Sequence, residues 1–237
     1  MNKDFINDLL NSKFFSNNII FNYDVVCVFL AGSRSMNIID ERSDYDLVVI
    51  TKDKPEQEEG IFRLSYKDIA VHWYYRSLEQ IIHSISSQDT FLSYISGINL
   101  FNIEKNIIWI NPIHKTKVNF ILNNKEKLVY NSCWDFIFAN PVFWDTIKHN
   151  EIPRHCYNKY VYHLCNCYYI LFNKDFEKEF LIKIKRLRWT NNAKEVLKDE
   201  LQKAYILIKE LYNYQESHNL KRKEIKEELL SKLKEVQ

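Results

Sequence analysis

Two aspartates separated by one residue begin an apolar segment in the sequence DYDLVVI, where they are Asp44 and Asp46. The apolar run predicts a buried strand. Residues i and i+2 of a strand point to the same side, so we expect the two carboxylates to project together. Neighbouring carboxylates repel each other unless a cation lies between them. Their hard oxygen ligands suit Mg²⁺ or Mn²⁺, and Mg²⁺ commonly shares its coordination shell with substrate phosphates.

A second apolar segment, Val25 to Leu30, precedes this pair and runs into a Gly-Ser turn. Its β-branched and aromatic residues predict another buried strand. The chain has only 3 glycines, and Gly32 at this turn permits a tight bend and the close approach of a ligand to the backbone. Ser33 and Arg34 add a hydroxyl group, backbone N–H groups and a positive charge, which suit phosphates. These features predict a nucleoside triphosphate between the turn and a carboxylate-bound metal.

The arrangement Gly32-Ser33, ten residues, Asp44-x-Asp46 resembles the signature of the DNA polymerase beta-like nucleotidyltransferase superfamily. The sequence GSRSMNIIDERSDYDLVVI is similar to that of small bacterial and phage members, including minimal and antibiotic nucleotidyltransferases. The resemblance implies two metal ions held by Asp44 and Asp46, outer phosphates held by Gly32 and Ser33, and added charge from Arg34. The alternative interpretation is a solvated turn followed by an aspartate pair that caps a loop.

Members of this superfamily place a third metal-binding carboxylate on the strand beside the one that carries the aspartate pair. The segment DIAVHWYY, residues 68–75, predicts such a strand, and Asp68 is its only acid. Asp68 is therefore the candidate for the third metal ligand, and for a general base toward the acceptor. Alternation places His72 on the same face as Asp68. Replacement of the acid by His72, or a site with only two carboxylates, remains open.

The second half of the chain changes from strand to helix periodicity. We expect an α+β protein, with a small mixed-sheet nucleotidyltransferase domain over residues 1–116 and an α-helical domain over residues 117–237. The pattern predicts helices over residues 120–138, 154–172, 176–187, 192–215 and 221–236. The segment KYVYHLCNCYYIL, residues 159–171, is similar to the helix that follows the catalytic domain in phage and RNA-ligase-associated members.

The resemblance implies a metal-dependent enzyme that moves a nucleoside monophosphate, expected to be AMP from ATP, onto a hydroxyl group and releases pyrophosphate. A small molecule such as an antibiotic, a protein hydroxyl and an RNA end all suit the motif as acceptors. The net charge of +2 favours a small molecule or a protein over a long nucleic acid. Two other classes remain: a catalytically inactive module that binds nucleotide or sequesters a partner, and an interaction protein built on the helical half.

The composition is that of an ordinary globular protein, with 46% hydrophobic and 27% charged residues. No apolar run approaches the roughly 20 residues that cross a bilayer, so we expect no membrane partner. The first residues, MNKDFINDLLNSKFF, do not have the layout of a signal peptide. The 5 cysteines have no spacing typical of a disulfide framework. We therefore expect reduced thiols and a cytoplasmic location.

Overall fold

The computed structural model describes residues 3–21, 23–39, 43–55, 62–83, 94–138, 160–186 and 198–236 of the chain. Residues 94–98 are helical. The other elements, in chain order, are α1 (Lys3–Leu10), α2 (Lys13–Phe15), η1 (Ser16–Ile20), β1 (Val25–Ala31), α3 (Gly32–Ser35), β2 (Tyr45–Thr51), β3 (Phe62–Tyr66), β4 (Ile69–Ser77), α4 (Leu78–Ile82), η2 (Asn99–Asn102), α6 (Ile103–Asn106), β5 (Ile107–Ile110), η3 (Pro112–His114), α7 (Lys115–Phe138), α10 (Tyr160–Leu171), α11 (Lys178–Arg186) and α13 (Lys198–Lys234).

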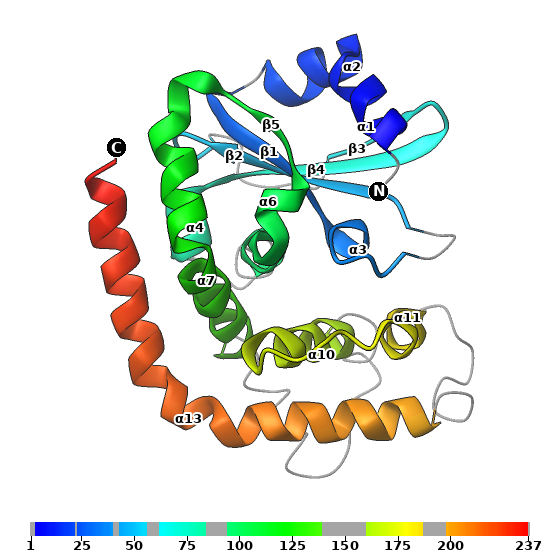
Figure 1. The fold of residues 1–237 in the computed structure, drawn as a ribbon, viewed down its shortest axis with the longest axis vertical. Coiled ribbons are helices and arrows are strands. Elements are labelled where there is room, and N and C mark those ends of the chain that lie inside the picture. The colour runs from blue at the N-terminus through cyan, green and yellow to red at the C-terminus, as the bar shows by residue number, and fades with distance from the viewer. Residues whose placement is uncertain are drawn as a thin grey trace. The chain divides into compact units, whose positions relative to one another are not determined.

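The strands form one five-stranded mixed sheet in the order β3-β4-β2-β1-β5 (Figure 1). β1 is antiparallel to both β2 and β5, and β3 is antiparallel to β4. β2 and β4 are parallel, so both enter the sheet from the same end. A five-stranded mixed sheet with several helices confirms the α+β class.

The central strands β1 and β2 are apolar at nearly every position because both of their faces are covered. On one face, the helices α1 and α2 pack on the sheet (Figure 1). The buried cluster there includes Leu47 and Trp73 from the strands and Phe5 and Phe15 from the helices. Burying one such side chain fully contributes roughly 1.5–3 kcal/mol. α3, α4 and α6 lie on the opposite side of the sheet (Figure 1), and this is the face on which Asp46 projects.

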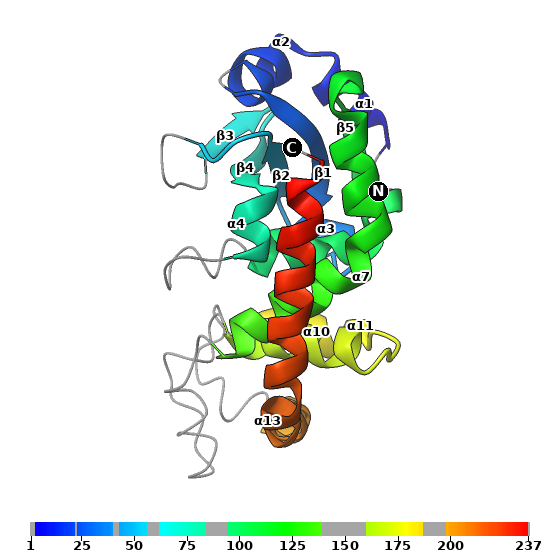
Figure 2. The ribbon, with the colours of Figure 1, turned by 90° about the vertical axis from the view of Figure 1, so that its left-hand side faces the viewer.

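The chain divides into two compact units. Unit 1 comprises residues 1–132 and 223–237, and it contains the whole sheet. The first part of α7 belongs to it, because Asn131 donates a hydrogen bond to the carbonyl of Ile82 at 3.0 Å. The end of α13, which runs beside α7 (Figure 2), belongs to it as well. Lys127 of α7 pairs with Glu228 of α13, and the side chain of Leu229 is fully buried.

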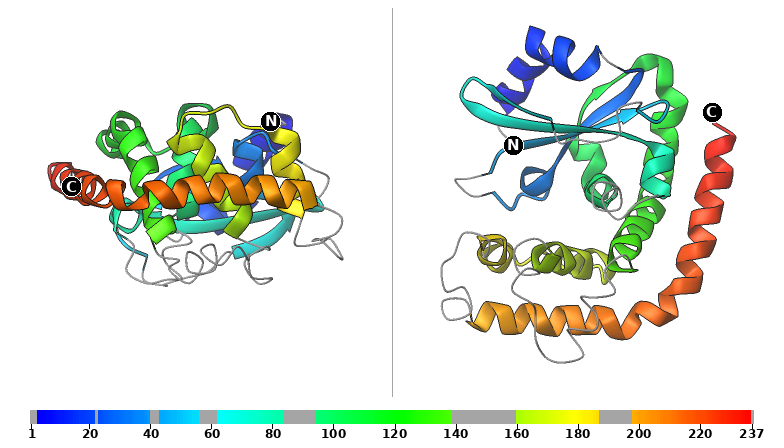
Figure 3. Two further views of the ribbon diagram at one scale, coloured as in Figure 1. Left: turned by 90° about the horizontal axis from the view of Figure 1, so that it is seen from below. Right: turned by 180° about the vertical axis from the view of Figure 1, so that it is seen from behind.

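Unit 2 comprises residues 133–222 and, where the structure describes it, is helical. The helices α10, α11 and the first part of α13 pack together (Figure 3). Tyr168 of α10 donates a hydrogen bond to Glu210 of α13 at 2.8 Å, and Lys203 of α13 pairs with Glu177 just before α11. Buried apolar side chains such as Leu181 complete this core.

The observed division differs from the predicted boundary between residues 116 and 117. Helix periodicity does begin there, because α7 starts at Lys115, but the units divide inside α7 and again inside α13. α13 is also one continuous helix, whereas the sequence predicted a break over residues 216–220, which contain no glycine or proline. The predicted helical residues 154–159, 187 and 192–197 lie outside the described part of the chain. Among the helices that the structure describes, none has the length and apolar character needed to span a membrane.

Candidate metal and nucleotide site

Four neighbouring strands form one row of paired residues across the sheet, and the candidate residues lie in this row or beside it. Ala31 at the end of β1 pairs with Asp46 in β2, Asp46 pairs with His72 in β4, and His72 pairs with Arg63 in β3. Directly paired residues project from the same face of a sheet. Asp46, His72 and Arg63 therefore share the face on which the turn after β1 lies.

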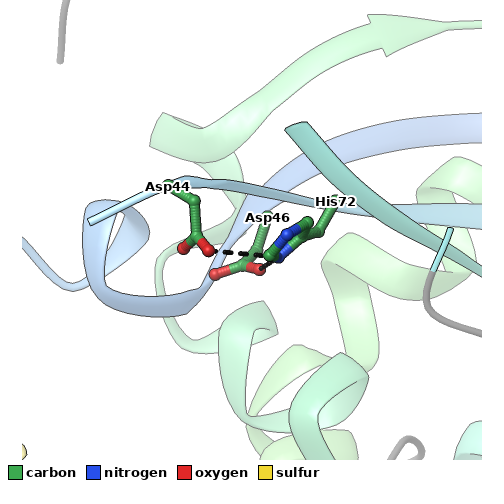
Figure 4. A group of neighbouring side chains, drawn as sticks. All are labelled: Asp44, Asp46 and His72. Carbon is green, nitrogen blue, oxygen red and sulfur yellow. Dashed lines mark ion pairs between the residues drawn. The ribbon is translucent and has the colours of Figure 1, made fainter. Parts of the chain in front are cut away.

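The side chains of Asp44, Asp46 and His72 point toward one another (Figure 4). His72 Nδ1 lies 3.1 Å from Asp44 Oδ2 and 3.4 Å from Asp46 Oδ1. All three side chains are partly accessible, with exposed fractions of 33% for Asp44, 27% for Asp46 and 16% for His72. An ion or a substrate can thus reach them from solvent.

This group could hold a metal ion, since one ligand atom from each residue lies within 4.8 Å of the other two. Two cis ligands, each about 2.1 Å from an octahedral ion, are about 3.0 Å apart, close to the separations of His72 Nδ1 from the two carboxylates. Among the described residues, this is the one group of three or more such side chains.

Gly32 makes room for the carboxylate of Asp46. A Cβ atom on Gly32 would lie 2.1 Å from Asp46 Oδ2, far inside any van der Waals contact, and the φ angle of Gly32 is +65°. Glycine adopts that angle without the strain that a side chain brings, and its missing Cβ atom lets the carboxylate approach so closely. Gly32 therefore permits the backbone turn and also leaves space for the Asp46 carboxylate.

The other two turn residues hold the loop that leads into β2. The Ser33 hydroxyl donates to the hydroxyl of Ser43 at 3.2 Å, and both side chains are buried. Arg34 donates from Nε to the carbonyl of Asp44 at 2.8 Å and from Nη2 to the carbonyl of Ser43 at 2.6 Å. Its guanidinium carbon also lies 4.0 Å from the centroid of the Tyr45 ring. These contacts position Asp44; contact of Ser33 and Arg34 with phosphate stays a prediction.

The two carboxylates favour the charged form of the His72 imidazole by raising its pKa. The hydrogen bond with Asp46 raises the pKa of His72 above its ordinary value of 6.5, burial opposes this, and the negative charges of Asp44 and Asp46 reinforce it. The positive charge of Arg63 lowers the pKa of His72 by a smaller amount. The buried Nε2 atom of His72 has no hydrogen-bond partner within the described residues. When His72 is protonated, the charge on its imidazole takes the place that a cation would fill.

Because the folded-state pKa of His72 is raised, its contribution to stability is present below the unfolded-state pKa and is lost as pH rises through the folded-state value. Without metal, we expect the melting temperature of the wild type to fall as pH rises across this range, relative to that of His72→Gln. A divalent cation displaces the proton, so the stabilisation by metal should grow with pH. Thermal melts with EDTA or metal, from about pH 5.5 to about pH 9, test this. Identical pH profiles for the two proteins would contradict it.

Asp68 lies away from this group. Lys67 and Asp68 form a two-residue turn between β3 and β4, with φ angles of +49° and +64°. Such a turn joins two antiparallel strands tightly. Asp68 lies four positions before His72, a distance of about 13 Å along an extended strand. The structure thus brings Asp44 and Asp46 together with His72, the open alternative of the sequence, and not with Asp68.

We expect Asp68→Asn to retain metal binding, and nucleotidyl transfer if the chain performs it, within about twofold of wild type. Asparagine tolerates a positive φ angle as well as aspartate does, so the turn is preserved while the charge is removed. Metal titrations of both proteins measure the effect. A loss of metal affinity as large as that caused by Asp46→Asn would instead place Asp68 in the site.

Arg63 is a site-facing residue that the sequence pattern did not reveal. It is exposed, it pairs with His72 across the β3–β4 hairpin, and its charge acts on the imidazole. The alternation of β3 was too short to show which face its side chains occupy. The position of Arg63 beside His72 follows from the order β3-β4-β2 in the sheet. That order depends on contacts between strands and cannot be read from the local sequence.

A separate cavity of about 460 Å³ lies in unit 2, at the start of α11 and of α13. It is lined by Glu177, Lys178, Glu179, Phe180, Lys183, Asp199, Glu200 and Lys203. Four carboxylates there face three ammonium groups, and Lys183 and Lys203 are already paired with Glu200 and Glu177. The excess of carboxylates over ammonium groups does not favour binding of a triphosphate in this cavity.

The chain was also compared with known proteins. Neither protein-family models nor curated proteins provide a match. The functional interpretation of the chain therefore depends on the motif residues and on the geometry of Asp44, Asp46 and His72.

Proposed function

We propose that the protein is a metal-dependent nucleotidyltransferase that moves AMP from ATP to a hydroxyl acceptor and releases pyrophosphate. The observation that carries this proposal is the convergence of Asp44, Asp46 and His72 beside the backbone of Gly32. A divalent cation there would lie against a tight turn, the combination that positions and neutralises a triphosphate.

Each described residue of the site has a part in this proposal. Asp44 and Asp46 hold Mg²⁺ or Mn²⁺, which supplies neutralisation of charge on the reacting phosphate. Gly32 keeps the Asp46 carboxylate in place, and Arg34 fixes the loop before β2. Arg63, exposed beside His72, contributes positive charge for the outer phosphates. The turn at Gly32 and Ser33 brings backbone N–H groups toward the same phosphates.

One observation favours a second candidate, a module that binds nucleotide without transferring it. An imidazole stands beside the aspartate pair, where the related enzymes are expected to have a third carboxylate. An imidazole whose proton is held by the two carboxylates cannot accept the proton of an acceptor hydroxyl, whereas an ionised carboxylate can. Such a module would bind ATP in a metal-dependent way and release no pyrophosphate.

Pyrophosphate release separates the two candidates. The purified chain is incubated with ATP labelled at the α-phosphate, a divalent cation and a fractionated cell extract, and both pyrophosphate and labelled extract components are measured. Transfer predicts pyrophosphate in proportion to labelled acceptor, and both products disappear without metal. Metal-dependent ATP binding without either product, across all fractions, supports the binding module. Absence of metal-dependent ATP binding contradicts both.

A further inference from the structure

The third side chain of the metal group is a nitrogen ligand, which bears on the identity of the ion. His72 Nδ1 lies 3.1 Å from Asp44 Oδ2 and 3.4 Å from Asp46 Oδ1, so the three atoms surround one position. Mg²⁺ prefers a rigid octahedral shell made of oxygen. Imidazole suits first-row dications such as Fe²⁺, Ni²⁺ and Zn²⁺, and Mn²⁺, the first member of that series, also takes the carboxylate ligands of Mg²⁺. Two carboxylates and an imidazole therefore form a mixed donor set in the described part of the site.

We propose that Asp44, Asp46 and His72 form a centre that selects a first-row transition-metal dication such as Mn²⁺ over Mg²⁺. This inference deepens the proposed function by naming the ion of the same site, and it rests on that function for the role of the ion.

The pairing of β4 with β2 fixes the position of His72 beside Asp46. His72 and Asp46 are directly paired in the parallel ladder of β2 and β4, and Val71 and Trp73 on either side of His72 are buried on the other face. A shift of β4 by one residue would move Val71 and Trp73 out of the core, so the register that buries them also places His72 beside the carboxylates. Gly32 has no side chain, so it leaves the space that the Asp46 carboxylate occupies beside the turn.

His72→Asp tests the proposal because it replaces the nitrogen ligand with oxygen at the same strand position. The dissociation constant for Mn²⁺ is measured on the full chain, without nucleotide, from the paramagnetic resonance signal of free Mn²⁺, and that for Mg²⁺ by competition. We expect the preference for Mn²⁺ over Mg²⁺ to fall by about 10-fold or more in His72→Asp. Arg63→Gln is the matched control. It removes a charge facing the same site and no ligand, so it should change both affinities and leave their ratio as in the wild type.

An equal ratio for wild type and His72→Asp, with both proteins folded by circular dichroism, would overturn the proposal. So would a wild type that binds Mg²⁺ as tightly as Mn²⁺. Because no nucleotide is present, the result is independent of catalysis. A wild type that shows no Mn²⁺ preference but releases pyrophosphate refutes the metal assignment alone. A Mn²⁺ preference without pyrophosphate release under any condition refutes the proposed function alone.

Discussion

Replacing Asp46 by asparagine is expected to lower pyrophosphate release by at least about 1000-fold, equivalent to ~4 kcal/mol of transition-state stabilisation. Asp46 lies in the centre of the row formed by β1, β2 and β4, and its carboxylate contacts both the Gly32 backbone region and His72. The amide keeps the shape of the side chain but lacks the charge that holds a dication. We expect the Asp44→Asn variant to behave in the same way, since Asp44 Oδ2 lies at a similar distance from His72.

The matched control is Asp53→Asn, which removes an exposed carboxylate just after β2. Its activity and metal affinity should match those of the wild type. Circular dichroism and thermal melts establish that all three variants keep the fold. Wild-type turnover in Asp46→Asn would show that this carboxylate has no part in the reaction.

Substitution of Gly32 by alanine has the second largest expected effect. The new Cβ atom would lie 2.1 Å from Asp46 Oδ2 and would force a residue with a side chain into a φ angle of +65°. We expect the backbone strain to cost about 1–3 kcal/mol of stability. Displacement of the carboxylate should lower metal-dependent activity by about 100-fold, since misplacement by about 1 Å suffices for such a loss. Activity per folded molecule and metal affinity are both measured.

Gly97→Ala separates loss of stability from loss of the site. A Cβ atom on Gly97 would lie 1.8 Å from Ser132 Oγ and 2.4 Å from Ser132 Cβ, away from the aspartates and within unit 1. Overpacking of this kind costs about 1–3 kcal/mol. Its melting temperature should fall, while the activity of the folded fraction stays at the wild-type level. Equal losses of activity per folded molecule in the two glycine variants would mean that Gly32 acts through stability alone.

The strands that carry the motif could be predicted because they are buried on both faces. Such strands appear in the sequence as continuous apolar runs, and β1 and β2 cover Val25–Ala31 and Tyr45–Thr51, close to the predicted segments. The alternation of Asp44 and Asp46 likewise indicated that both carboxylates face the same way. These features are local, and local sequence decides them.

The third residue of the candidate metal group could not be identified in the same way. Alternation placed Asp68 and His72 on one face, but the position of each along the sheet depends on the turn at Lys67 and on the parallel register that pairs His72 with Asp46. That register is set by contacts between strands far apart in the sequence. In the structure β4 begins at Ile69, and Asp68 belongs to the tight turn before it. Two residues with positive φ angles are a common way to join antiparallel strands.

The division into units was beyond the sequence pattern for a related reason. Helical periodicity indicates that one side of a helix is buried and does not say which neighbour buries it. The first part of α7 and the last part of α13 pack in unit 1 through Asn131 and Leu229, whereas the remaining residues of both helices belong to unit 2. A boundary drawn where strands give way to helices therefore differs from the boundary between compact bodies.

Calorimetric titration of the chain with a non-hydrolysable ATP analogue, with and without Mn²⁺, tests the central claim most directly. Wild type is compared with the double variant Asp44→Asn/Asp46→Asn and with Asp53→Asn. The account predicts that Mn²⁺ strengthens binding of the analogue to wild type and to Asp53→Asn by about 10-fold or more and has no effect on the double variant. Binding that is equally strong with and without Mn²⁺, or that survives unchanged in the double variant, would contradict a nucleotide site built on Asp44, Asp46 and a bound dication.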